Sequence, residues 1–174
     1  MHKQTGRYGD IPCEFYEIEG FEVKVRGFEQ VKPEHQRYGT EGIIPTRGTA
    51  HSAGYDFKTP IDFDIKAGEK LLVWTNIKAF MPPFEFLMIV PRSSVGAKKN
   101  IMLANTVGVI DADYYENEDN DGNIGMVLRN IGDETVSFKK GDAICQGIFM
   151  EYKIADGDSI HEVRKGGFGS STID

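Results

Sequence analysis

The sequence has few cysteines and no long apolar run, and both absences narrow the class of protein. Its two cysteines, Cys13 and Cys145, are far apart and lack C-x-x-C spacing, which predicts a reducing compartment and no disulfide framework. The longest apolar run, residues 86–90, is far too short to span a bilayer. No apolar segment follows the first residues, so we expect no signal peptide. The expected location is the cytoplasm, with no membrane partner.

Basic residues are in the minority, with 20 Lys and Arg against 27 Asp and Glu, a net charge of -7 and a pI near 5.1. Proteins that bind nucleic acid usually carry a basic face, so no nucleic-acid partner is expected. An anionic small ligand is compatible with this charge if Arg or Lys lies beside it. The sequence also contains no Walker loop, no G-x-G-x-x-G, no H-E-x-x-H and no internal repeat.

The residues that are abundant favour a β fold. The 174 residues suit one domain with a real core, and 20 Gly with 11 Phe and 7 Tyr favour an all-β chain with many turns. Alternating or apolar runs predict strands at residues 21–28, 61–65, 70–76, 85–90, 107–110, 123–130, 135–138 and 143–150. At most one short helix is expected, at 95–100, with Ser93 or Ser94 as its N-cap. Residues 1–20 have no clear period and are expected to form an extension or an edge element.

A stretch in the second half of the chain combines an apolar strand with two carboxylates. Val107, Val109 and Ile110 form a β-branched run that predicts a buried strand, and the run ends in Asp111 and Asp113. Residues two apart on a strand point to one face, so both carboxylates share a face if the strand continues that far. A rigid strand that delivers carboxylates to its end can carry a functional site. The alternative is that both aspartates are turn residues that close the strand.

A second candidate site follows the predicted strand 85–90. Arg92, Ser93 and Ser94 stand directly before the expected helix, whose N-terminus would offer free backbone N–H groups beside hydroxyls and a guanidinium. Such groups suit a phosphate. The alternative is an ordinary helix cap beside a solvated arginine.

The acidic tract 116–122 follows the two carboxylates. It shares part of the pattern of a calcium loop, but position 12 would be Leu128 where a bidentate Glu is needed, so we predict a solvated hairpin tip. Further on, Gln146 lies between Ile144 and Ile148 on one face of the last predicted strand. A buried amide there needs partners, either as a structural amide or as part of a site.

The C-terminal tail loses the alternation after residue 151. Three glycines around Phe168 make a strand implausible. A disordered tail is one interpretation. A nucleotide lid is the other, because Arg164 can neutralise a phosphate, Phe168 can stack on a base, and Gly and Ser can donate to oxygens.

Five stretches together resemble the five motifs of the homotrimeric dUTP pyrophosphatase (dUTPase) family, in the family's order. They are 53–56 (AGYD), 91–94 (PRSS), 108–114 (GVIDADY), 141–146 (GDAICQ) and 164–171 (RKGGFGSS). The resemblance implies one domain over residues 1–174 with a jelly-roll-like β fold. Residues 1–20 would then be an N-terminal extension, and 151–174 a C-terminal tail that closes the active site as a lid.

The resemblance also implies a reaction. dUTP and water would give dUMP and pyrophosphate, which keeps uracil out of DNA and supplies dUMP for dTMP synthesis. Mg²⁺ is the implied cofactor, held by the substrate phosphates without a direct protein ligand, and Asp56 and Gln146 would contribute to it at most indirectly. The implied partners are dUTP and further copies of the chain, since each site of the homotrimer combines residues from three chains.

Each site residue carries a role implied by the resemblance. Asp111 matches the general base that deprotonates a water attacking the α-phosphorus, and losing such a base costs about 10²- to 10⁴-fold in rate. Arg164 matches a clamp on the γ-phosphate, and Asp56 a supporting carboxylate near the phosphates. The other matched positions contact the substrate: Arg92, Ser93, Ser94 and Gln146 at the phosphates, Asn105, Gly108 and Ile110 at uracil, Tyr114 at the deoxyribose, and Phe168, Gly169 and Ser170 in the tail.

The chain departs from the family pattern at three places, one of which is residues 1–20, which have no counterpart in it. Residues 116–121 lengthen the hairpin after the third motif, and Arg164 stands two residues before Gly166, where three is commoner. The closest rival is dCTP deaminase, which shares the fold and the Arg-Ser-Ser pattern but uses a catalytic Glu where this chain has Val127. A regulatory protein that senses the nucleotide is the other alternative, although an intact Asp111 argues against sensing as the only role.

Overall fold

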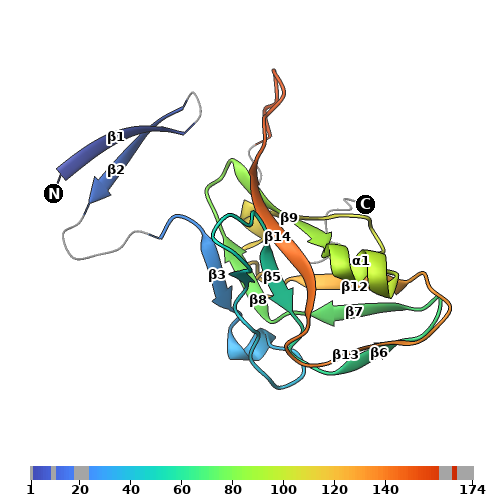
Figure 1. Ribbon diagram of the computed structural model, residues 1–174. Coiled ribbons are helices and arrows are strands. Elements are labelled where there is room, and N and C mark those ends of the chain that lie inside the picture. The colour runs from blue at the N-terminus through green and yellow to red at the C-terminus, as the bar shows by residue number, and fades with distance from the viewer. Residues whose placement is uncertain (1, 9–10, 18–23, 161–165, 168–174) are drawn as a thin grey trace.

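The computed structural model describes residues 2–8, 11–17, 24–160 and 166–167, and strands dominate it (Figure 1). The strands are β1 His2–Tyr8, β2 Ile11–Glu17, β3 Gly27–Gln30, β4 Thr46–Arg47, β5 Tyr55–Lys58, β6 Phe63–Ile65, β7 Lys70–Trp74, β8 Ile77–Phe80, β9 Glu85–Pro91, β10 Ile101–Leu103, β11 Gly108–Asp111, β12 Gly125–Asn130, β13 Val136–Phe138 and β14 Ala143–Glu151. The described ranges also contain one α-helix, α1 Ser93–Lys99, and two 3-10 turns, η1 Pro33–His35 and η2 Ala112–Tyr114. The prediction of an all-β chain with one short helix is confirmed.

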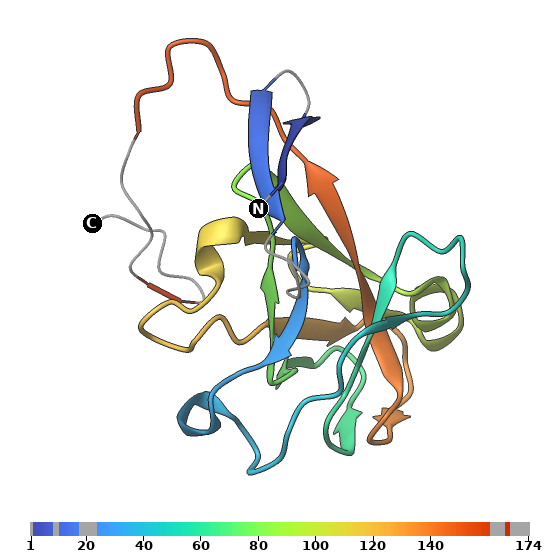
Figure 2. The ribbon, with the colours of Figure 1, turned by 90° about the vertical axis from the view of Figure 1, so that its left-hand side faces the viewer.

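The strands form small antiparallel sheets in a jelly-roll-like arrangement (Figures 1 and 2). The largest sheet has the order β11-β9-β14-β5-β4 and the next has the order β10-β12-β7, while β13 pairs with β6 and β3 with β8. In the largest sheet β9 and β14 lie inside, with Glu151 opposite Glu85 and Cys145 opposite Pro91. This long pairing fixes which residues lie at each end of the sheet.

One hydrophobic core joins these sheets. Strand β9 shows the period of two, because Leu87 and Ile89 are buried while Met88 between them is half-buried. The largest fully buried side chains are Phe57, Phe138, Ile65, Ile77, Leu87, Ile89, Ile101, Leu103, Ile124, Met126, Leu128 and Ile144. Burial of each such side chain contributes about 1.5–3 kcal/mol, so the strands that carry the candidate site residues are firmly held.

The predicted strand 21–28 is wrong at residues 24–26. Residues 24–26 lie outside any strand, Val25 is 41% exposed, and β3 begins only at Gly27. The strand begins there because its partner β8 ends at Phe80, which lies opposite Gly27. A Cβ at Gly27 would lie 2.8 Å from the ring of Phe80, so the glycine lets that ring pack on the backbone. Positions 18–23 lie outside the described residues.

Sequence periodicity also missed strands that depend on distant partners. Strands β8 and β10 have four and three residues and pair with β3 and β12. Residues 1–20, predicted as an extension or edge element, contain the antiparallel pair of β1 and β2, which forms a sheet of its own. The seven-residue α1 is the longest helix in the described ranges, and none there has the length and apolar character of a membrane span.

Candidate active site

Residues of three predicted motifs meet at one end of the largest sheet. Gln146 on β14 lies opposite Asp56 on β5, and Cys145 lies opposite Pro91, the last residue of β9. Arg92 follows Pro91, and its Nε lies 3.0 Å from Oδ1 of Asp56. Three stretches that are far apart in the sequence thus place a guanidinium, a carboxylate and an amide at the same end of the sheet.

Gly54 and Gln146 pack closely against each other at this edge. A Cβ at Gly54 would overlap the amide of Gln146, so a larger residue in the first motif would displace that amide. Gln146 is half-buried, and its Nε2 donates to the carbonyl oxygen of Pro91 over 3.5 Å. The amide therefore has the polar partner that its place between two isoleucines requires.

The helix beside Arg92 begins earlier than predicted. It starts at Ser93, Arg92 occupies the N-cap position, and there is no side-chain cap hydrogen bond, so the prediction of Ser93 or Ser94 as N-cap is wrong. The reason is that β9 continues to Pro91 and Arg92 stays extended, with φ -70° and ψ 145°, so the strand runs directly into the helix. Both serines are exposed in the first turn, with hydroxyls that do not cap the helix.

Asp111 lies at the other end of the same sheet. Strand β11 pairs with β9, and Asp111 lies opposite Phe86 near the start of β9. The prediction of a buried strand is wrong, because Val107 and Val109 are 40% and 56% exposed. Among the described strands, β11 is at the edge of its sheet, and none of them pairs with its far side.

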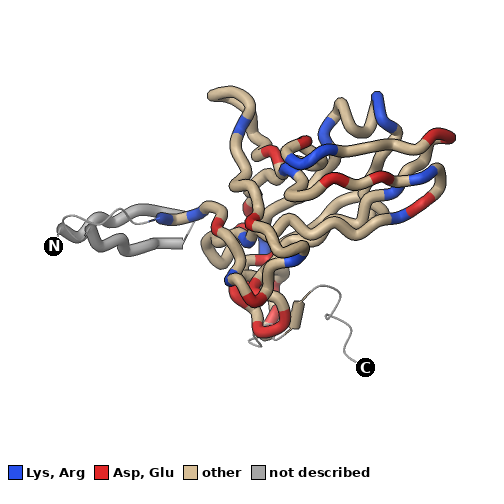
Figure 3. The backbone as a smooth tube through the Cα atoms, turned by 90° about the horizontal axis from the view of Figure 1, so that it is seen from below, with Lys and Arg blue, Asp and Glu red and all other residues tan. Residues whose placement is uncertain are grey.

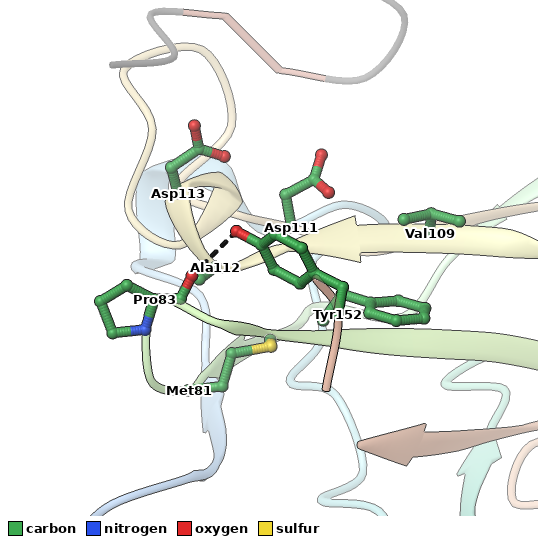
Figure 4. A pocket seen from close by; sticks show the side chains of 8 residues that line it. Met81, Pro83, Val109, Asp111, Ala112, Asp113 and Tyr152 are labelled. Atoms are coloured by element: carbon green, nitrogen blue, oxygen red, sulfur yellow. Dashed lines mark hydrogen bonds between the residues drawn. The ribbon is translucent and has the colours of Figure 1, made fainter. Parts of the chain in front are cut away.

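The strand also ends at Asp111, and Asp113 lies on the 3-10 turn η2. A single strand face therefore does not carry both carboxylates, although Figure 4 shows them pointing to the same side of the chain. Asp111 is half-buried and Asp113 is exposed. Asp111 therefore lies on a strand, as the first interpretation of this stretch predicted. Asp113 lies in a turn, as the alternative predicted.

A cavity of about 740 Å³ lies beside these two carboxylates (Figure 4). Its lining consists of Met81, Pro83, Phe86, Val109, Asp111, Ala112, Asp113 and Tyr152. Apart from the two aspartates the lining is apolar or aromatic, and Tyr152 donates its hydroxyl to the carbonyl oxygen of Pro83 over 2.9 Å. The sequence analysis did not predict this apolar lining.

Tyr114 is the last residue of η2, and its side chain is buried in the interior. It is 4% exposed, its hydroxyl donates to the carbonyl oxygen of Asn123 over 2.9 Å, and the hydroxyl accepts from Nδ2 of Asn120 over 2.8 Å. On β11, a Cβ at Gly108 would lie 3.1 Å from Cβ of Ile89, so glycine lets this edge strand lie close to β9. The structure therefore holds Tyr114 and the β11 backbone in fixed positions next to Asp111.

The remaining predicted site residues fall into two sets. Asn105 is exposed in the turn before β11, and Ile110 is half-buried against the core. Four others lie outside the described residues, namely Arg164, Phe168, Gly169 and Ser170.

The two groups of site residues are far apart within one chain. Asp111 lies beside Phe86 and Arg92 follows Pro91, so five residues of β9 separate the two ends by roughly 17 Å. Asp56, which holds Arg92, lies on β5, three strands away from β11 and roughly 14 Å across the sheet. A single chain therefore places the carboxylate of Asp111 and the guanidinium of Arg92 at different corners of the sheet.

The loop 116–123 is not the solvated hairpin tip that its acidity predicted. Asn117, Asn120 and Asp121 are 7%, 5% and 1% exposed. Nδ2 of Asn117 donates to the carbonyl oxygen of Tyr114 and to Oδ1 of Asn120, over 2.8 Å each. Asn and Asp side chains bond readily to nearby backbone, and here they fold the loop onto itself. The asparagines between the acidic residues indicate such a folded loop, and the prediction of a solvated tip gave them too little weight.

A buried ion pair anchors this loop to strand β8. Nζ of Lys78 lies 3.1 Å from Oδ2 of Asp121, and the backbone N–H of Lys32 donates to the same oxygen over 2.7 Å. Burial by itself would raise the pKa of Asp121, but the hydrogen bonds from Lys32 and Lys78 outweigh it and hold that pKa below its ordinary 3.8. Burial would lower the pKa of Lys78, but Glu116 and Asp121 outweigh it and raise that pKa above 10.5.

Comparison with known sequences places this geometry in one family. A profile of the dUTPase family matches residues 40–172. The deoxyuridine 5'-triphosphate nucleotidohydrolase of Lactococcus lactis is 46% identical over 152 residues, which cover 86% of this chain and 99% of that protein. The human mitochondrial protein of the same name is 37% identical over 141 residues, which cover 78% of this chain and 52% of that protein.

Solved structures show the same relationship. The crystal structure of dUTPase from Streptococcus mutans has a TM-score of 0.67 and 41% identity, and the match covers 75% of this chain and 99% of that chain. The dUTPase from phage phi11 of S. aureus has a TM-score of 0.63 and 18% identity over 84% of this chain and 99% of that chain, a likeness of fold alone. From the profile, the relatives and the shared fold, we conclude that the chain belongs to the dUTPase family.

Proposed function

We propose that this protein hydrolyses dUTP to dUMP and pyrophosphate, with Asp111 as the general base. The observation that carries the proposal is the position of Asp111, half-buried at the end of a strand and lining a cavity of about 740 Å³. The support from relatives is the 46% identity to the Lactococcus lactis deoxyuridine 5'-triphosphate nucleotidohydrolase. A carboxylate fixed on a strand beside a cavity can orient a water and accept its proton, which is the task of a base in this reaction.

At the phosphate end, Arg92, Ser93, Ser94 and Gln146 would bind the triphosphate. The guanidinium of Arg92 is held by Asp56, so its planar fork is already oriented before a ligand arrives. Ser93 and Ser94 are exposed beside it and can donate hydroxyl hydrogen bonds. Asp56 would therefore act by orienting Arg92, and charge neutralisation at the phosphates would provide much of the catalysis.

At the nucleoside end, Asn105, Gly108 and Ile110 would contact uracil, while Tyr114, which is only 4% exposed, would support this end of the site from the interior. A Cβ at Gly108 would point at Ile89 of β9, so any contact of Gly108 with a base would be made by its backbone N–H and C=O groups. A pocket closed in this way can reject a larger base such as thymine by steric exclusion, which is easier than rejecting a smaller one. Arg164, Phe168, Gly169 and Ser170 complete the proposal as the part of the tail that would close over the nucleotide.

We infer that the working enzyme is a homotrimer with shared sites. Asp111 and Arg92 of one chain lie at opposite ends of β9, roughly 17 Å apart along the strand. A base acts only within about 2.6–3.2 Å of the heavy atom that carries the proton, or through one water. In the assembly, the end of the sheet that carries Arg92 in a second copy would face the end that carries Asp111 in the first copy. Both groups would then reach one nucleotide.

The residues at the phosphate end also fit Mg²⁺. The donors there are oxygen atoms of Asp56 and Gln146, and oxygen is the ligand type that Mg²⁺ takes, usually together with substrate phosphates. Within the described ranges no group of three or more His, Cys, Asp or Glu could hold a metal, so a bound ion would rely mainly on the triphosphate. When bound, Mg²⁺ would supply charge neutralisation at the phosphates.

The test is release of pyrophosphate from dUTP, dCTP, dTTP and UTP with Mg²⁺, together with analysis of the bases in the products. We expect release from dUTP alone. Release of ammonia from dCTP would overturn the proposal in favour of the deaminase, although Val127 on β12 supplies no carboxylate for that reaction. No turnover of any of the four would leave a binding or regulatory role.

A further inference from the structure

The lengthened hairpin 116–121 holds the buried residue Tyr114 at two points. Nδ2 of Asn117 donates to the backbone carbonyl oxygen of Tyr114 over 2.8 Å, and Nδ2 of Asn120 donates to the hydroxyl of Tyr114 over 2.8 Å. Four of the six residues 116–121 are acidic, and Figure 3 shows acidic positions close together in this part of the chain. The two residues that hold Tyr114 are the two uncharged ones, so this contact is separate from the charge of the loop.

The loop fixes the side chain of Asn120 in one orientation. Asn120 is 5% exposed, and its Oδ1 accepts from Nδ2 of Asn117 over 2.8 Å and from the backbone N–H of Gly122 over 3.1 Å. Gly122 has a φ of 81°, and a Cβ there would lie 2.9 Å from the carbonyl oxygen of Tyr114. Glycine therefore lets the loop close over Tyr114. Because both ends of its amide are bonded, Asn120 can hold the hydroxyl of Tyr114 in a defined place.

The second partner of this hydroxyl is anchored to the core. The hydroxyl of Tyr114 donates to the backbone carbonyl oxygen of Asn123 over 2.9 Å. The side chain of Asn123 accepts from the backbone N–H of Asn76 over 3.0 Å and donates to Oδ1 of Asn76 over 3.1 Å. Asn76 is fully buried and directly precedes β8. Tyr114 is thus held between the lengthened hairpin and the body of the fold.

Tyr114 is connected to the candidate base through a single turn. The 3-10 turn η2 has three residues and ends at Tyr114, and Asp111 occupies its N-cap position without a side-chain cap hydrogen bond. The hydrogen-bond geometry of a 3-10 turn is poorer than that of an α-helix, so so short a turn is weak by itself. The contacts of Tyr114 therefore help to hold the turn that fixes the direction in which the chain leaves Asp111.

We propose that Asn120 is a positioning residue that sets the orientation of the Asp111 carboxylate through Tyr114 and η2. The inference rests on the proposed function, since it takes Asp111 as the general base. All of these residues belong to the chain that carries Asp111, so the arrangement does not depend on how copies of the chain assemble. Asn120 itself touches neither the substrate nor the reacting atoms. It gives the lengthened hairpin a role in the chemistry.

The kinetic test is Asn120→Ala, with Glu118→Ala as the matched control from the same loop. A misplacement of a catalytic group by about 1 Å can cost roughly 10²-fold in rate, and the loss of one supporting hydrogen bond should cost less. In Asn120→Ala we expect kcat for dUTP to fall roughly ten-fold, with KM within about two-fold of wild type. Glu118 is exposed, and within the described residues no hydrogen bond or ion pair is found for its side chain, so Glu118→Ala should change neither constant.

Two double variants show whether the effect passes through Tyr114 and Asp111. Tyr114→Phe keeps the ring but removes the hydroxyl, so its effect on kcat should be non-additive with that of Asn120→Ala. Asp111→Asn has no base left to orient, so adding Asn120→Ala should lower kcat no further. Partial unfolding caused by Asn120→Ala would instead lower kcat by the same factor with and without the base.

A further readout is independent of dUTP. Hydrogen exchange of the backbone amides in residues 111–115 can be followed in the full-length protein without nucleotide. Loss of the Asn120 contact should make this exchange faster by roughly ten-fold in Asn120→Ala, and Glu118→Ala should leave it at the wild-type rate.

The outcomes separate this inference from the proposed function. If the wild type does not hydrolyse dUTP but residues 111–115 exchange faster in Asn120→Ala, the proposed function fails and the hold of Asn120 on the turn stands. If the wild type is active and Asn120→Ala changes neither kcat nor the exchange, the positioning role is overturned. A raised KM with unchanged kcat, or an equal loss of kcat with and without Asp111, would also overturn it.

Discussion

Asp111 and Arg92 lie at opposite ends of strand β9, Asp111 beside its second residue and Arg92 directly after its last. The proposed base and the proposed phosphate-binding guanidinium of one chain are thus separated along a rigid strand whose alternate side chains, Leu87 and Ile89, are fully buried. Bending such a strand would disrupt the core, so the two ends do not approach each other within a chain. The separation makes assembly of copies a requirement of the proposed chemistry.

Mixed oligomers of two inactive variants test this requirement. Asp111→Asn and Arg92→Ala should each lose activity alone, and refolding them together should restore part of it. With random mixing of equal amounts, a site has an intact Asp111 with probability one half and an intact Arg92 from another copy with probability one half, so about a quarter of the sites recover. The measurement is pyrophosphate release after joint refolding, with separately refolded variants mixed afterwards as the control. No recovery would show that one chain supplies both residues.

Replacement of the proposed base separates binding from chemistry. Asp111→Asn keeps the shape of the side chain at the end of β11 but removes the proton acceptor, so turnover should fall by about 10²- to 10⁴-fold. Binding of a non-hydrolysable dUTP analogue, measured by calorimetry, should stay close to wild type. Asp113→Asn is the control, because Asp113 lines the same cavity from the 3-10 turn. Turnover of Asp111→Asn near the wild-type rate would refute the assignment.

The ion pair of Asp56 and Arg92 should matter for catalysis more than for stability. The side chain of Arg92 is 38% exposed, so the pair contributes about 1 kcal/mol or less to folding. Asp56→Asn should therefore leave the denaturant midpoint nearly unchanged, while kcat/KM falls roughly ten-fold because the guanidinium loses its orientation. Asp62→Asn, which breaks the exposed pair with Lys139, is the control and should change neither quantity. A large loss of stability in Asp56→Asn would instead assign the pair a structural role.

The buried pair of Lys78 and Asp121 should matter for stability. Asp121→Ala leaves the ammonium of Lys78 buried with Glu116 as its one remaining charged partner among the described residues, so the free energy of unfolding should fall by about 3 kcal/mol. Urea unfolding measures the change. Adding Lys78→Met should recover part of the loss, because the uncompensated charge is then removed. If the double variant is less stable than Asp121→Ala, an unpaired Lys78 is not the cause of the destabilisation.

The same pair predicts a pH dependence of stability. The folded-state pKa of Asp121 is depressed, so its contribution is present above the ordinary value of 3.8 and is lost as pH falls through the lower folded value. The folded-state pKa of Lys78 is raised, so its contribution is present below 10.5 and is lost as pH rises through the higher folded value. The difference in unfolding free energy between wild type and Asp121→Asn should be level between these limits and shrink below pH 3.8. A difference that shrinks at neutral pH would contradict this.

Several features of the fold follow from local pattern. The alternation in residues 85–90 and 143–150 predicted β9 and β14 closely, because both strands bury one face in the core. The family motifs predicted which residues come together at the end of the sheet that carries Gln146 and Asp56. Strand β8 escaped prediction because its pairing with β3 depends on residues about fifty positions away. The edge strand β11 was predicted as buried because sequence shows that a run is apolar but not whether a neighbour covers it.

The sequence by itself determined the class of fold, the family motifs and the identity of the candidate base, because these depend on residue type, spacing and periodicity. Only the tertiary structure decided that Asp111 and Arg92 stand at opposite ends of one strand. It also decided that Asn117, Asn120 and Asp121 of the acidic loop 116–123 are buried and that Asp119 receives the N–H of Gly167. These relationships join residues far apart in the chain, and their energies come from desolvation and hydrogen-bond geometry, which exist only when the chain is folded.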